Sequence, residues 1–214
     1  MHTLFGFQGS GSAAIEIALQ RSGVPWRTVD AASWEAESAL AELEAVNPLR
    51  QIPTLQLPDG SVLTESAAIL IHLGLMFPAA GLLPTDEPAR AQAIRGLVFI
   101  AANCYAAIGI GDYPERWIAG GPDEPADGAI VERVRQGARA RLHACWDIFA
   151  DEFPAQPFLS GASAGALDHL AVVVSKWSGT RAHLRVSRPA FFDTLQRIEA
   201  LPDVAPVFAR HWPA

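Results

Sequence analysis

The residues best suited to chemistry lie in two short stretches. Ser10 and Ser12 stand in the Gly-Ser-Gly-Ser segment at 9–12, between an expected strand and an expected helix. Glu65 and Ser66 precede another apolar helical pattern. Free N–H groups and the dipole at a helix start favour an anion, and a nearby carboxylate attracts an ammonium group. These positions predict a polar binding site with hydroxyl groups beside it.

A third stretch offers main-chain groups. Pro53 opens an expected strand and cannot donate a ladder hydrogen bond. A cis bond between Ile52 and Pro53 would turn the N–H and C=O of Ile52 outward, where they can pair with an extended peptide ligand. We therefore expect this bond to be cis.

Residues 1–77 contain the elements that must position these groups. The second expected strand follows the first helix, so a right-handed crossover should make the first two strands parallel. A hairpin is indicated by Pro58-Asp59-Gly60 between two apolar runs. The expected order is β-α-β-α-β-β-α, with strands at 3–7, 26–29, 53–57 and 61–63 and helices at 13–21, 34–46 and 64–76.

The remainder of the chain predicts only helices after a proline-rich linker. We place the linker at 78–87 and an all-helical unit at 88–214, with an exposed loop at 120–128. The longest apolar stretch, 96–111, is shorter than a membrane span and contains Asn103, so a buried helix is expected there. The expected helices are 89–107, 126–150, 167–182, 189–200 and 203–210.

The amino-acid composition argues against several classes of function. The formal net charge is −7, and no cluster of Lys and Arg is present, so a nucleic-acid surface is not expected. The two cysteines, Cys104 and Cys145, form neither a disulfide framework nor a metal pattern. We expect a globular cytoplasmic protein with no metal and no membrane partner.

Residues 47–73 carry a family resemblance. The run Asn-Pro-Leu-Arg-Gln-Ile-Pro-Thr-Leu at 47–55, the Asp-Gly turn and Leu-Thr-Glu-Ser-Ala-Ala-Ile at 63–69 resemble the cytosolic glutathione S-transferases, of a bacterial beta-like or serine type. The resemblance implies an α+β protein with a thioredoxin-like domain at 1–77 and an all-α domain at 88–214. It also implies a homodimer that acts in detoxification.

The resemblance implies how glutathione would bind, as substrate or cofactor. The Ile52 main chain would pair with the cysteinyl unit, while the γ-glutamyl end would meet Glu65, Ser66 and Gln51. A small hydrophobic electrophile or a peroxide would lie against the helical half. There Asn103 and Tyr105 are candidates for the pocket, with Tyr105 offering a hydroxyl to a substrate.

The first helix departs from the family pattern where the thiol is activated. Alignment with the beta class places Gly11 where the family has a cysteine. Alignment with the serine-dependent classes instead places the activating position near Gly9 or Ser10. Ser10 is therefore the first candidate for holding the thiolate, and Ser12 is the second, because a serine just before an apolar helix also suits an N-cap. Main-chain N–H groups at this helix start are a further possibility.

Three alternatives stay open. An isomerase that uses glutathione as cofactor fits the same residues. A non-catalytic protein-binding adaptor is favoured because Gly11 stands where a cysteine might be expected. The segment Gly9-Ser10-Gly11-Ser12-Ala13-Ala14, with Asp30 after the next strand, also fits a dinucleotide-binding fingerprint, but the chain lacks the further parallel strands of that fold.

Asp168 carries a structural expectation. The family usually has Ser or Thr three residues before this aspartate, and here the position is Gly165. Glycine is tolerated as an N-cap, and an aspartate at the third helical position can bond first-turn N–H groups. We expect a weakened helix cap without a catalytic role.

Overall fold

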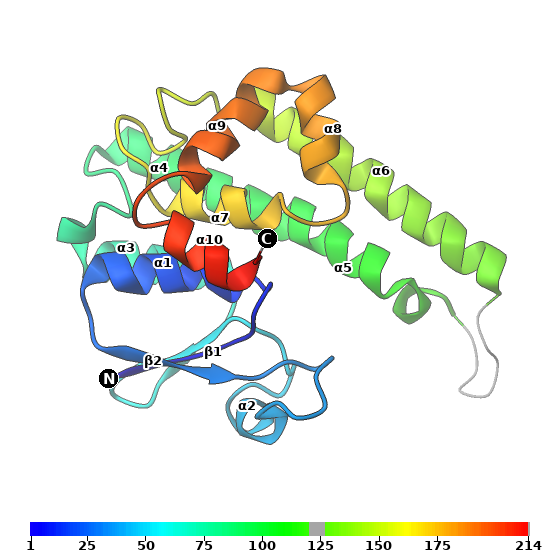
Figure 1. The fold of residues 1–214 in the computed structure, drawn as a ribbon, viewed down its shortest axis with the longest axis horizontal. Helices are drawn as coiled ribbons and strands as arrows, with labels where there is room; N and C mark the ends of the chain where they lie inside the picture. Colours follow the sequence, from blue (N-terminus) through cyan, green and yellow to red (C-terminus); the bar gives the residue numbers. More distant parts are fainter. Residues whose placement is uncertain (120–126, 214) are drawn as a thin grey trace.

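The computed structural model describes residues 1–119 and 127–213, which form a small sheet unit followed by a larger helical unit (Figure 1). The expected loop at 120–128 falls mainly outside these residues. The sheet has the strand order β2-β1-β3-β4. Its strands are β1 (His2–Gly6), β2 (Trp26–Asp30), β3 (Thr54–Gln56) and β4 (Val62–Leu63).

The strand directions confirm the predicted topology. Strands β1 and β2 are parallel, while β3 is antiparallel to both β1 and β4. Side chains alternate across a strand, so neighbours on β1 enter different cores. Leu4 joins the main core with helix α1 (Ser12–Ser22) and helix α3 (Ser66–Met76), whereas Phe5 packs in a smaller cluster with Leu43 of helix α2 (Leu40–Val46). In Figure 1, α1 and α3 lie on one side of the sheet and α2 on the other.

Helix α2 is shorter than expected because side-chain bonds fix the segment before it. The Ser38 hydroxyl accepts from the Ala32 N–H at 3.1 Å and donates to the Ala32 carbonyl at 2.8 Å. The Ala39 N–H donates to the Asp30 carbonyl at 2.9 Å. Local bonds from serine compete with helix formation, so the predicted start at residue 34 is wrong and α2 begins at Leu40.

The helical unit begins with one long apolar run. Helix α4 (Glu87–Phe99) continues through a π-helical turn, η2 (Ile100–Tyr105), into helix α5 (Ala106–Asp112). By length and composition this run passes as a membrane span, although the core helix of a globular protein passes the same test. Leu97, Ile100 and Cys104 are buried against the other helices, which agrees with the expected core helix.

The remaining helices surround a fully buried one, α7 (Ala166–Val174). The predicted single helix at 167–182 is wrong: it ends at Val174, and helix α8 (Thr180–Ser187) follows a turn. Ser178 and Gly179 both have positive φ angles, at 55° and 75°, which a helix does not accommodate. The other helices are α6 (Gly128–Glu152), α9 (Pro189–Glu199) and α10 (Ala205–His211).

The α7 start confirms the expected cap and shows why glycine stands there. Asp168 accepts the Gly165 N–H at 2.9 Å and also fastens the preceding loop, accepting the N–H groups of Leu159 at 2.8 Å and Ser160 at 3.0 Å. A Cβ built on Gly165 would lie 2.7 Å from the Leu82 carbonyl oxygen. There is therefore no room for the Ser or Thr of the family pattern.

His169, the next residue, is fully buried in α7. Neither ring nitrogen has a hydrogen-bond partner in the described part of the chain. Burial, together with the nearby positive charge of Arg21, lowers the pKa of His169 from about 6.5 to about 3. The imidazole is therefore neutral at ordinary pH.

Candidate active site

The loop that joins β1 to α1 is built around two buried serines. Ser10 Oγ and Ser12 Oγ are 2.9 Å apart, and both hydroxyls lie within 3.4 Å of the Phe7 amide nitrogen. Ser10 Oγ also accepts the Ser12 N–H at 3.2 Å. Both side chains are less than a tenth exposed, so their hydroxyls are bonded inside the loop.

The expected N-cap role of Ser12 is wrong. Helix α1 begins at Ser12 and Gly11 occupies the N-cap position, which offers no side-chain bond. The first-turn N–H of Ser12 is satisfied by Ser10, two residues earlier. Ser10, predicted to face a ligand, thus supports the start of the helix.

At Gly11 the sheet unit is in close contact with the helical unit. A Cβ built on Gly11 would clash with the hydroxyl oxygen of Tyr105, and it would lie 3.3 Å from the Tyr105 Cζ and 3.5 Å from the Pro53 Cδ. Tyr105 is the last residue of the π-helical turn η2. The phenol from the helical unit therefore occupies the space that a side chain at position 11 would fill.

The segment before β3 presents main-chain groups beside this point. The Ile52–Pro53 bond is cis, as predicted. Neither the N–H nor the C=O of Ile52 is paired with any residue of the described chain. Gln51 is exposed, while its carbonyl accepts from Asn47 Nδ2 at 3.1 Å and from Thr54 Oγ1 at 2.8 Å.

Asn47 holds the segment before β3 in place, a role that the sequence analysis did not predict. Its side chain is buried, contacts Thr54 Oγ1 at 2.9 Å and accepts the Leu49 N–H at 3.1 Å. These bonds tie the end of α2 to the start of β3. An asparagine directly before Pro48 is a signal for such a turn.

Glu65 and Ser66 lie at the start of α3, which follows strand β4 in the chain. Ser66 is buried at the first helical position, and no side chain caps this end. Glu65 is exposed and has a φ angle of 65°, which is rare for a residue with a side chain. Backbone strain of this kind clusters at ligand sites.

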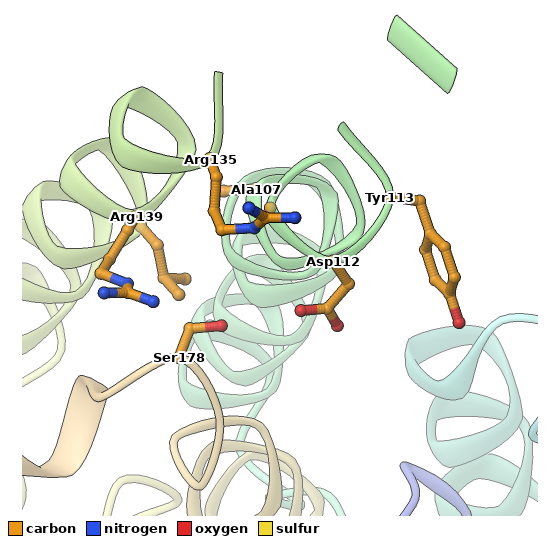
Figure 2. A pocket seen from close by; sticks show the side chains of 8 residues that line it. Ala107, Asp112, Tyr113, Arg135, Arg139 and Ser178 are labelled. Atoms are coloured by element: carbon orange, nitrogen blue, oxygen red, sulfur yellow. The ribbon is translucent and has the colours of Figure 1, made fainter. Parts of the chain in front are cut away.

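The helical side offers a cavity of about 420 Å³ between α5, α6 and the turn before α8. Figure 2 shows Arg135, Arg139 and Asp112 converging on it, with Ser178 below. Of the two residues predicted for an acceptor pocket, Asn103 donates to the Phe99 carbonyl at 3.2 Å within its own helix. Tyr105 points instead to Gly11, and its ring packs 5.8 Å from that of Trp177.

Helix α10 forms hydrogen bonds with the β1–α1 loop. The Gly9 N–H donates to His211 Nδ1 at 3.1 Å, and the His211 Nε2 lies 2.7 Å from the Glu16 carboxylate. Gln8 donates to the Arg210 carbonyl at 2.9 Å. In Figure 1, α10 lies beside α1. No pattern in the sequence predicts these contacts, which join residues 202 and 195 positions apart.

We expect replacement of His211 by alanine to loosen the loop. The Gly9 N–H would lose its acceptor, and buried Glu16 would keep only its 3.0 Å ion pair with Arg210. Amide hydrogen exchange at residues 9–12 should accelerate about tenfold, the equivalent of ~1.4 kcal/mol of local stability. Mass spectrometry of exchanged peptides measures this, and unchanged exchange in the loop would contradict it.

The fold is a thioredoxin-like domain joined to a helical region, and the unpaired main-chain groups of Ile52 lie beside the Gly11–Tyr105 contact. The family model described as "Glutathione S-transferase, N-terminal domain" matches residues 12–75. An uncharacterised GST-like protein of Escherichia coli K12, YncG, is 30% identical over 178 residues, which cover 83% of this chain and 82% of that protein. The chain belongs to the glutathione S-transferase family.

Two further similar proteins differ in their sequence identity and in how much of the chain they cover. The crystal structure of a glutathione transferase homologue from Sulfitobacter, with bound glutathione, is 26% identical. It has a TM-score of 0.83 and covers 97% of this chain and 96% of its own. A probable maleylacetoacetate isomerase of Caenorhabditis elegans is 42% identical over 89 residues, which span 42% of this chain and 39% of that protein.

Proposed function

We propose that this chain binds glutathione and activates its thiol, as a glutathione transferase or a glutathione-dependent isomerase. The observation that carries the proposal is the strained, uncapped start of α3: Glu65 at positive φ beside buried Ser66. The γ-glutamyl carboxylate meets Ser66 and the free N–H groups of this helix end, and Glu65 takes the ammonium group.

The rest of the peptide follows the sheet edge. The cysteinyl unit pairs with the unpaired N–H and C=O of Ile52 next to Pro53, and exposed Gln51 reaches the γ-glutamyl end. This places the sulfur toward the start of α1. In this proposal residues 1–77 bind glutathione, and residues 88–214 supply the acceptor pocket after a linker at 78–87.

The chemistry depends on the thiolate. A free thiol has a pKa of about 8.5, so a group that stabilises the thiolate raises the fraction of nucleophile at neutral pH. The sulfur electron pair then forms a bond to an electrophilic carbon. In a transferase the leaving group departs with its bonding pair; in an isomerase the sulfur–carbon bond breaks again after rotation and glutathione is returned.

Replacement of Ser66 by alanine tests the binding site. The hydroxyl that meets the γ-glutamyl carboxylate is lost, and a hydrogen bond to a charged group contributes about 1.4 kcal/mol or more. Calorimetry should therefore show glutathione binding about tenfold weaker. Glu65→Ala should also weaken binding, through loss of the partner of the ammonium group.

Ser22→Ala is the matched control, because Ser22 only bonds the Ala18 carbonyl at the far end of α1. Unchanged affinity in both Ser66→Ala and Glu65→Ala would contradict the proposed site. Tight glutathione binding without turnover of any electrophile would favour the adaptor alternative over the enzyme.

A further inference from the structure

The protein has no side chain at position 11, where the beta-class alignment expects a cysteine. The serines on either side do not compensate, since their hydroxyls are buried and bond to each other and to the Phe7 amide. A hydroxyl nevertheless reaches this point from outside the loop: the space beside Gly11 is filled by the phenol oxygen of Tyr105.

We propose that Tyr105 is the catalytic residue that holds the glutathione thiolate, replacing a hydroxyl or thiol from the β1–α1 loop. This inference rests on the proposed function of the site. Its basis is a juxtaposition of three groups: the phenol oxygen, the N-cap of α1 and the Pro53 ring. The cysteinyl sulfur of a peptide paired with Ile52 would lie close to all three.

Tyr105 is well placed to act as a donor. The residue is partly exposed, and its hydroxyl has no hydrogen-bond partner among the described residues, so it can donate to a ligand. The ring is fixed by Trp177 at 5.8 Å. The widened turn that ends at Tyr105 is of a kind often found at functional sites.

The surroundings of the phenol keep its proton in place. Burial and the carboxylates of Glu65 and Asp112 raise the pKa of Tyr105 well above its ordinary value near 10. The phenol therefore remains O–H and donates to the sulfur, while the thiol proton passes to solvent water. The positive end of α1 adds to the stabilisation of the anion.

The test separates binding from thiol activation. Wild type and Tyr105→Phe are titrated with glutathione by calorimetry, and the ultraviolet absorbance of the bound thiolate is followed against pH. Tyr105→Phe should bind glutathione with affinity within about threefold of wild type, while the thiol pKa rises by about one unit, a tenfold loss of thiolate. Turnover at neutral pH should fall in parallel and recover at higher pH.

Two control variants sharpen the result. Tyr113→Phe makes the same chemical change at the other tyrosine of the chain and should leave the thiol pKa unchanged. Ser10→Ala should also leave it unchanged, because the Ser10 hydroxyl serves the loop. An unchanged thiol pKa in Tyr105→Phe, or an equal rise in Ser10→Ala, would overturn the assignment. Failure of wild type to bind glutathione would instead refute the proposed function itself.

Discussion

Replacing Asp168 by alanine should lower the free energy of unfolding by about 3–5 kcal/mol. Three backbone N–H groups, from Gly165 and from the loop at 159–160, would lose their acceptor together. Asp168 is fully buried, so water cannot readily replace the carboxylate. Urea unfolding followed by tryptophan fluorescence measures the change, and Trp146 in the core is a suitable reporter.

Asp193→Ala provides the matched control. Asp193 is exposed on α9, and its loss should change the free energy of unfolding by less than about 0.5 kcal/mol. Asp168→Asn, which keeps the shape but presents an N–H₂ group to backbone donors, should remain clearly destabilised. Similar losses in Asp168→Ala and Asp193→Ala would show that the three bonds do not stabilise the fold.

His169 should make the protein sensitive to acid. Its pKa is about 3 in the folded chain and near 6.5 when unfolded, so between these values only the unfolded chain takes up the proton. Stability therefore falls as the pH drops below about 6.5. Between pH 7 and pH 5 the contribution is about 2 kcal/mol, from 1.4 kcal/mol per pKa unit.

His169→Gln removes this titration, and its free energy of unfolding should fall by about 2 kcal/mol less than that of wild type over the same pH range. Unfolding in urea at pH 7, 6 and 5 gives the comparison. His72→Gln, which removes a partly buried imidazole from α3, controls for the loss of one histidine. If wild type and His169→Gln decline in parallel, the buried imidazole is not the source of acid sensitivity.

Local patterns were sufficient to predict most of the fold. Alternation on β1 and the Asp-Gly turn identified the strands, and their order implied the observed parallel and antiparallel pairs. The errors lie where a few polar bonds or positive φ angles override an apolar pattern. Ser38 stops α2 from starting early, and Ser178 with Gly179 interrupts the helix expected at 167–182.

In the candidate site, too, local patterns predicted some features and missed the contacts made by distant residues. The cis bond between Ile52 and Pro53 was predicted from a proline at the start of a strand, and it is confirmed. Gln51 was proposed from the family resemblance, and Glu65 with Ser66 from their place before an apolar helix; their roles in binding stay predictions. Tyr105 and His211 reach the β1–α1 loop from distant helices, and no spacing in the sequence relates them to Gly9 or Gly11. The π-helical turn that directs Tyr105 has no local sequence signature.

The contacts between α10 and the β1–α1 loop have a consequence for protein synthesis. A ribosome adds about 5–20 residues per second, and domains that emerge first generally fold first. The sheet unit can therefore form while the helices are still being made, but Gly9 and Glu16 receive His211 only after α10 has left the exit tunnel. The loop that carries Gly11 is thus completed last, and a nascent chain lacking α10 should display a folded sheet with an unfinished site.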